Sequence, residues 1–310
     1  MAPVRLSAGD LELVLDPDRG GSIMALRVRS FDLLRPCWDP EQPDPRRFAC
    51  FPLVPFSGRI DRGRFVHAGR THAVPLNFAP EPHAIHGDGW TSPWALVSAG
   101  PSAAELELLH DRPEAVWRYR AWQRFWLYPD RLEVELGVTN RGPAAMPFGL
   151  GLHPYLTHRE DALLSAEVAG VWLPDDANIP RRLEPVPVLW RFDAARPVEE
   201  LVLDHNFQGW SGTARIDWPE HGRSLTIAAD PPLRHLVVYV PPGMDFFCVE
   251  PVSQVADGFN LLADGVADTG VQILGPGETE QAHKTDEWCS QRRIEQATAL
   301  YSDLIAEWCN

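Results

Sequence analysis

The 310-residue chain carries 28 basic and 43 acidic residues, a net charge of −15 with histidine neutral. This balance argues against nucleic acid or an anionic membrane as a partner, because both need clustered Lys and Arg. Five cysteines without CxxC spacing predict neither a disulfide framework nor a zinc knuckle. Residues 1–17 lack a signal-peptide pattern and no stretch approaches the about 20 apolar residues of a membrane span, so we expect a cytoplasmic protein.

Alternating segments predict antiparallel strands at short intervals. Residues 11–15, 105–109 and 132–138 show period-two alternation, and turn-forming residues follow each of them. The aromatic-rich run 119–128 also favours a strand, and thirty prolines spread along the chain exclude long helices over most of it. These elements predict an all-β protein, with one large antiparallel β-sandwich over residues 1–283.

The last third of the chain adds two other patterns. Residues 236–240 and 246–249 are apolar throughout, so we expect strands buried on both faces, with a break at 241–243. Residues 290–308 place apolar side chains three and four positions apart, which predicts an amphipathic helix. We therefore expect a short C-terminal helical extension over residues 284–310, packed on the body of the protein or on a neighbouring subunit.

One carboxylate, Glu250, lies at the end of the second apolar run, directly before a proline. A carboxylate in such a setting costs free energy unless it is paired or hydrogen-bonded. Two histidines have similarly constrained surroundings: His86 lies in a glycine-rich turn, and His153 precedes Pro154, which favours an extended backbone. These three side chains are candidates for proton transfer or ligand binding. Simpler roles stay open for them, namely packing or core histidines and a structural carboxylate paired with Arg59.

Other side chains suit a sugar ligand. Arg59 follows an apolar segment and can hold a hydroxyl pair or a carboxylate through its planar guanidinium. Asp204 opens a polar cluster that ends near Trp210, although an ordinary turn explains that cluster equally well. Most of the twelve tryptophans must belong to the core, and the rest, for which we choose Trp90 and Trp210, can stack on the apolar face of a sugar ring.

A metal site is the main competing interpretation, because His83 and His86 lie three residues apart and Glu250 follows downstream. Two histidines project from the same face of a strand only at a spacing of two residues. The proline-bounded loop around His83 and His86 is not expected to be helical either. We therefore expect no metal.

Five segments, taken in chain order, resemble motifs of the aldose 1-epimerase (galactose mutarotase-like) family. They are VPFSGRI at 54–60, HGDGW at 86–90, GLGLHPY at 149–155, DHNF at 204–207 and VEP at 249–251. The resemblance runs from about residue 11 to residue 283. It implies the large β-sandwich of that family, called a supersandwich, with the sugar in an open cleft on one face.

The resemblance also implies the roles of the site residues. Glu250 would be the general base and His153 the general acid, while His86, Arg59 and Asp204 would position the sugar. The activity implied is interconversion of the α and β anomers of a free aldose by ring opening and reclosure. This reaction involves no redox step and no phosphate activation, so no cofactor is expected. The oligomeric state expected is a monomer or a homodimer.

Two departures and three alternatives accompany this interpretation. Gly58 stands where the family usually has Asn before the arginine, and the helical tail lies outside the family pattern. A sugar-6-phosphate epimerase would need extra arginines at the cleft rim, and Arg62 and Arg64 are close to Arg59 in sequence. A sugar-binding module would lack an acid or a base, and a glycosidase would need two close carboxylates, which Glu250 and Asp204 could supply. For the epimerase we expect a Glu250 that is ionised at rest and a His153 that can hold a proton, on opposite sides of the anomeric carbon.

Overall fold

A computed structural model describes residues 2–37, 39 and 44–282 of the chain. These residues form antiparallel strands, six short 3-10 turns and one α-helix, α1 (Gly258–Ala263). The helix predicted over residues 290–308 lies outside the described residues. Each of the other predicted strands is present, at 11–16, 103–110, 119–127, 132–140, 235–240 and 246–252.

The largest sheet has eleven strands within the described residues and runs across the whole molecule. Its order is β1 (Val4–Ala8), β2 (Leu11–Asp16), β3 (Ser22–Val28), β5 (Cys50–Leu53), β15 (Gly151–Thr157), β24 (Phe246–Val252), β23 (His235–Val240), β20 (Leu203–Gln208), β17 (Gly170–Pro174) and β18 (Pro180–Glu184), with β4 (Phe31–Asp32) on β3. The central neighbours β5, β15 and β24 come from distant parts of the chain, so the sheet brings together motifs far apart in sequence.

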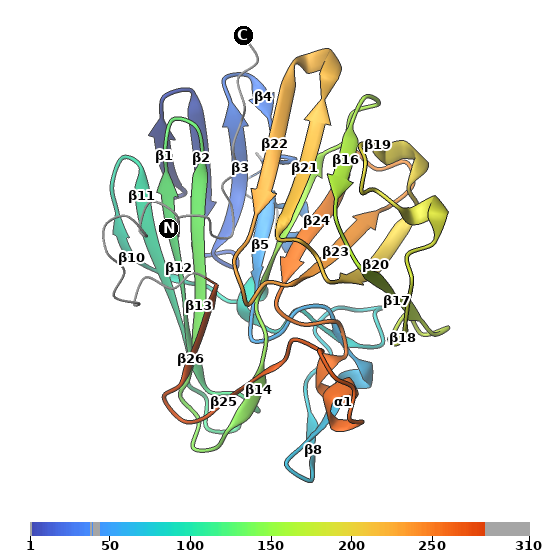
Figure 1. Cartoon of the computed structure of the whole chain (residues 1–310). Helices are drawn as coiled ribbons and strands as arrows, with labels where there is room; N and C mark the ends of the chain where they lie inside the picture. The colour runs from blue at the N-terminus through green and yellow to red at the C-terminus, as the bar shows by residue number, and fades with distance from the viewer. Residues whose placement is uncertain (1, 38, 40–43, 283–310) are drawn as a thin grey trace, which may run out of the picture.

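Two smaller sheets accompany the large one (Figure 1). One consists of β10 (Ala95–Ala99), β11 (Ala103–His110), β12 (Tyr119–Leu127), β13 (Leu132–Asn140) and β26 (Thr279–Ala282). The other consists of β19 (Arg196–Pro197), β16 (Leu163–Ala166), β21 (Thr213–Trp218) and β22 (Arg223–Ala228). Their inward side chains share one hydrophobic core with those of the large sheet, which makes a β-sandwich.

Short pairs and turns complete the structure. The two-stranded pairs are β6 (Arg59–Ile60) with β9 (Ala84–Ile85), β7 (Arg64–His67) with β8 (Arg70–Ala73), and β14 (Met146–Phe148) with β25 (Gln272–Leu274). The 3-10 turns are η1 (Pro45–Arg47), η2 (Asp61–Gly63), η3 (Gly89–Thr91), η4 (Val188–Trp190), η5 (Val198–Glu200) and η6 (Pro219–His221).

Both faces of the central strands are covered, for different reasons. Leu236, Val238 and Val249 point into the sandwich core, whereas Tyr155 and Cys248 belong to a separate apolar cluster on the other face. This follows from the period of two in a strand. The prediction of a strand buried on both faces is confirmed for β24, while β23 is more open on the second face. That second face carries the candidate site.

Strand β13 differs from its prediction as a half-buried strand, because Glu133 and Glu135 are buried as well. Arg124 Nη1 donates to Glu135 Oε1 at 2.8 Å, and Trp122 Nε1 donates to the same oxygen at 2.6 Å. Arg131 Nε donates to Glu133 at 2.7 Å. Buried carboxylates are tolerated when they are paired in this way.

The sequence predicted neither a membrane span nor a disulfide framework, and the described part of the chain bears on both. None of its helices has the length and apolar composition that a membrane span requires. Cys37, Cys50 and Cys248 are buried and have free thiols.

Candidate active site

One row of side chains crosses five neighbouring strands of the large sheet. The register pairs Phe51 with His153 on β5 and β15, and Glu250 with Val237 and Val237 with Asn206 on β24, β23 and β20. On β15 and β24, Gly151 faces Val252 and Tyr155 faces Cys248, which sets His153 opposite Glu250. All five side chains of this row therefore share one face of the sheet, and all five line the same cleft.

The row above, two residues along each strand, supplies Tyr155, Tyr239 and Asp204 to the same cleft. The remaining wall comes from segments that fold over the sheet: Arg46, Gly58, Arg59, Phe78, Glu81, Ile85, His86, Trp90 and Ala256. The cleft has a volume of about 220 Å³. Pockets for drug-sized ligands typically measure roughly 300–1,000 Å³, so this one suits a single sugar ring.

His153 and Glu250 lie side by side on the floor of the cleft. His153 Nε2 is 3.3 Å from Glu250 Oε1, and the two side chains are almost completely buried. Phe51 and Tyr155 both pack against the imidazole, each with its ring centroid 4.7 Å away, and their own centroids are 5.9 Å apart. The imidazole is thus fixed by packing, and its Nε2 is directed at the carboxylate.

Burial shifts both of these groups toward their uncharged forms. It raises the pKa of the Glu250 carboxyl well above its usual value, with Asp204 adding to the rise and Arg59 opposing it. It lowers the pKa of the His153 imidazole to about 3, and the nearby cation of Arg35 contributes to the decrease. An ionised Glu250 beside a protonated His153 is therefore not the favoured resting state, contrary to the expectation from sequence.

The expected placement of the two groups on opposite sides of the anomeric carbon also needs correction. Because His153 and Glu250 are 3.3 Å apart, no sugar ring fits between them. They instead present two adjacent polar atoms to the cleft. The hydroxyl oxygen and the ring oxygen of an aldose are bonded to the same carbon, so an adjacent pair of groups can serve both.

His86 is held as a neutral hydrogen-bond donor. Its backbone N–H donates to the Gly58 carbonyl at 2.8 Å, and the Gly58 N–H donates to His86 Nδ1 at 3.2 Å. An imidazole that accepts at Nδ1 carries its proton on Nε2 when it is neutral. Burial lowers the pKa of His86 well below its usual value, and His153 and Arg59 lower it further. The ring lies edge-on to that of His153, with centroids 5.3 Å apart.

Arg59 and Asp204 form the polar rim of the cleft. Arg59 Nη2 lies 3.5 Å from Asp204 Oδ2, and Arg59 Nε lies 3.6 Å from Glu81 Oε1. Asn178 Nδ2 donates to the same Asp204 oxygen at 2.9 Å. Arg59 therefore contacts Asp204 and Glu81, and the interpretation of Glu250 as its structural partner is not supported.

Gly58 has a structural reason to be a glycine. Its φ is +64°, and a Cβ there would lie 2.6 Å from the Cβ of Ala256. Asn tolerates a positive φ, but this position lacks the space for any side chain. The contact that the family's usual Asn would make is absent from this site.

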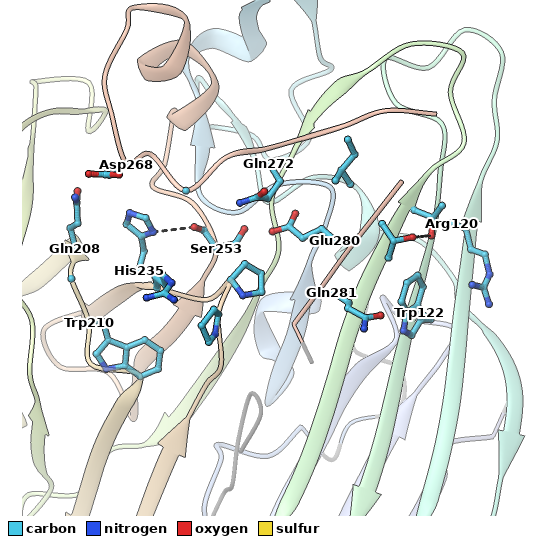
Figure 2. Close-up of a pocket in the computed structure, with 18 residues that line it drawn as sticks. Arg120, Trp122, Gln208, Trp210, His235, Ser253, Asp268, Gln272, Glu280 and Gln281 are labelled. Carbon is cyan, nitrogen blue, oxygen red and sulfur yellow. Dashed lines mark hydrogen bonds between the residues drawn. The ribbon is translucent and has the colours of Figure 1, made fainter. Parts of the chain in front are cut away.

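The two tryptophans chosen as sugar contacts are separated. Trp90 lines the cleft with 2% of its surface exposed, and its ring lies against Phe51 and His86. Trp210 lines a different hollow (Figure 2), so its expected role in this cleft is wrong. Trp210 lies six residues beyond Asp204 and follows the end of β20. At roughly 3.3 Å per strand residue, this places it at the opposite end of that strand from Asp204.

The metal interpretation is also disfavoured. His83 Nδ1 accepts from the Arg62 N–H at 3.0 Å and Nε2 bonds to the Ala177 carbonyl at 2.9 Å, so both ring nitrogens are occupied. His153, Cys248 and Glu250 do place possible ligand atoms within 4.8 Å of one another. A metal would need the Cys248 thiolate, and burial raises the pKa of that thiol well above its usual value.

Several lining residues carried no local sequence signal. Glu81 and Arg46 belong to segments that reach the cleft only after the chain has folded over the sheet. Phe51 and Tyr239 are recognisable only through their registers, opposite His153 and Asp204 respectively.

Comparisons with known proteins show the family. The family model described as aldose 1-epimerase matches residues 4–285. An Escherichia coli K12 protein named YphB, described as uncharacterized, is 33% identical over 282 residues, which cover 88% of this chain and 94% of that protein.

Solved structures give the same result. A putative aldose 1-epimerase from E. coli K12 superposes with a TM-score of 0.82 at 31% identity, covering 90% of this chain and 96% of that one. A galactose mutarotase-like protein from Clostridium acetobutylicum has a TM-score of 0.78 at 19% identity, with 89% and 92% covered, and supports the fold alone. The chain described here belongs to the aldose 1-epimerase family.

Proposed function

We propose that this protein interconverts the α and β anomers of a free, uncharged aldose. The observation that carries the proposal is the contact between His153 and Glu250 on the floor of a cleft sized for one sugar ring. Two adjacent groups that can exchange a proton are what ring opening at C1 requires. The other cleft residues supply hydrogen bonds to sugar hydroxyls.

The reaction proceeds without a net change in protons. Glu250 as carboxylate removes the proton from the C1 hydroxyl, the C1–O5 bond breaks, and O5 takes a proton from His153 Nε2. The open-chain aldehyde rotates about C1–C2 and recloses on its other face with the two roles reversed. The neutral resting pair holds the same number of protons, so transfer across the contact to His153 prepares the reactive form.

The remaining groups position the sugar. His86 Nε2–H donates to one hydroxyl, Asp204 accepts from others, and the Arg59 guanidinium donates from the rim. Each positioned proton transfer contributes roughly 10²–10⁴ to the rate. The chemistry moves protons only, and we propose that it uses no cofactor.

The charge of the cleft favours a neutral substrate over a sugar phosphate. Glu81, Asp204 and Glu250 line it together with only two cations, Arg46 and Arg59. Arg46 is already bonded to Asp44, and Arg62 and Arg64 are not among the residues that line the cleft. Because Glu250 is uncharged at rest, the two arginines are balanced by Glu81 and Asp204, and no excess of cations is left to hold a dianion. Comparing glucose with glucose 6-phosphate as substrate tests this choice.

The substitution Glu250→Gln tests the proposal, because the amide keeps the size of the side chain and cannot accept the proton. We expect mutarotation of a freshly dissolved pure anomer, followed by optical rotation, to fall at least 10²-fold. Sugar binding measured by calorimetry should remain within a few-fold of that of the unmodified protein. Near-normal mutarotation by the variant would refute the assignment, and sugar binding without turnover by the unmodified protein would identify a binding module instead.

A further inference from the structure

A hollow larger than the cleft lies elsewhere in the described part of the chain. Its volume is about 920 Å³, against about 220 Å³ for the cleft. It is bounded by β26 and β13 on one side and by the ends of β20 and β23 on the other (Figure 2). None of the residues that line it lines the cleft.

Two buried polar side chains in this hollow lack partners. Both carboxyl oxygens of Glu280 are without a hydrogen-bond partner among the described residues, and so is Nε2 of His235. Glu280 is 6% exposed and His235 is 4% exposed. Figure 2 shows the Glu280 carboxyl close to Ser253 and Gln272, while His235 bonds through Nδ1 to the Ser253 carbonyl at 3.0 Å.

The neighbouring groups do not account for Glu280. Burial raises the pKa of its carboxyl to about 8, and the nearby Ser253 hydroxyl partly offsets the rise. That hydroxyl accepts the Leu150 N–H at 2.8 Å and has one proton to donate, which can serve at most one of the two Glu280 oxygens. Buried polar groups in native proteins are nearly always bonded, and an unbonded one destabilises the fold. A side chain kept at such a cost is characteristic of a binding site.

The rest of the lining indicates the ligand. Amide and hydroxyl side chains, which both donate and accept, are frequent there: Thr139, Gln208, Ser253, Gln272, Thr279 and Gln281. Two largely buried indoles and two adjacent prolines add a small apolar surface: Trp122, Trp210, Pro231 and Pro232. Indole surface beside amides suits the alternating apolar and hydroxylated faces of sugars.

The charge of the lining and the volume of the hollow limit the class of ligand further. Arg120 in the lining is bound to Glu107 at 2.6 Å, and Arg234 shares the hollow with Asp268. The lining therefore has no excess of either sign that would select an ion. The volume is near the upper end of the roughly 300–1,000 Å³ found for ligand pockets, which exceeds the need of one sugar ring.

We propose that this hollow is a second binding site that takes a neutral oligosaccharide, with Glu280 and His235 bonded to its hydroxyl groups. The site is independent of the activity proposed for the cleft. An oligosaccharide can bind here whether or not the cleft turns over a monosaccharide.

Titration of the full-length protein with raffinose and with maltotriose tests the proposal. Raffinose has no free anomeric carbon, so it cannot be a substrate for anomer interconversion. We expect binding by calorimetry at millimolar concentration or tighter. Hydrogen exchange measured by mass spectrometry should show protection at residues 268–281 and not at residues 84–90. Absence of binding by both sugars, or protection confined to residues 84–90, would overturn the proposal.

Two substitutions separate a binding role from a structural one. Glu280→Met keeps the length of the side chain and removes the buried carboxyl, so it should raise the melting temperature and weaken oligosaccharide binding at least 10-fold. Gln281→Ala should weaken binding with little change in melting temperature. The cleft variant Asp204→Ala serves as the control and should retain raffinose binding. A lower melting temperature together with unchanged binding in Glu280→Met would contradict the proposal.

Discussion

The contact between His153 and Glu250 determines how the cleft holds its protons. Two interacting groups 3.3 Å apart titrate as a pair, so the first proton belongs to both. The raised pKa of Glu250 and the lowered pKa of His153 widen the pH range over which the pair holds a single proton. That singly protonated pair is the form that the proposed mechanism uses.

The pH profile of mutarotation follows from this pairing. The value of kcat/KM should stay flat from neutral pH toward the second protonation of the pair, which the His153 pKa places at about 3. Its alkaline limb should lie well above the usual pKa of a glutamate. Polarimetry across pH measures the profile, and circular dichroism at each pH identifies any loss due to unfolding. An acid limb near 6.5 would show that His153 titrates as an isolated imidazole.

At the scale of elements, the short pair β6–β9 positions the cleft wall. Arg59 pairs with Ile85 in that register, and His86 follows directly. Gly58 closes the unit through its two hydrogen bonds with His86 and its contact with Ala256. Any movement of Gly58 therefore moves the Arg59 and His86 side chains together.

The substitution Gly58→Ala tests this coupling. A positive φ costs a non-glycine residue roughly 1–2 kcal/mol, and overpacking against Ala256 adds roughly 1–3 kcal/mol. The matched control is Gly69→Ala, because Gly69 also has a positive φ, +72°, but nothing within 4 Å of its added Cβ. Denaturant unfolding should show a larger loss for Gly58→Ala, and polarimetry should show a raised KM for that variant alone.

A compensating change isolates the steric part of the effect. Adding Ala256→Gly to Gly58→Ala removes the clashing methyl group and should restore much of the lost stability and of the sugar affinity. Independent effects of the two changes would add without recovery, and that result would show that β6 is not held by this contact.

Local patterns explain which parts of the structure were predictable. Period-two alternation predicted strands that are present, and the short motifs selected Glu250 and His153, which lie together in one cleft. Burial of Glu133 and Glu135 was not predictable, since it depends on arginines and a tryptophan that other residues bring alongside.

At the scale of the whole molecule, the order of the strands in the sheet determines which side chains meet in the cleft. The sheet order places β24 between β15 and β23, so residues nearly one hundred positions apart share a face. Nothing local in the sequence encodes that order. For the same reason Trp210 was assigned to the cleft although β20 ends between it and Asp204, and the hollow around Glu280 was not foreseen.

The last prediction concerns how much of the chain the sandwich needs. The family match ends at residue 285, and the large sandwich core is contributed by residues up to Ala282 in β26. The E. coli structure is covered to 96% of its length by this chain, so its fold is complete with the matched residues. We therefore expect a variant shortened to residues 1–285 to melt within about 2 °C of the full chain, since a loss of 1 kcal/mol corresponds to roughly 2–4 °C at this size. Mutarotation should likewise be unchanged within two-fold, roughly 0.4 kcal/mol.

As the control, shortening to residues 1–278 removes β26 from its pairing with β13 and should lower the melting temperature sharply. A large loss of stability or turnover in the 1–285 variant would show that residues 286–310 are part of the working fold.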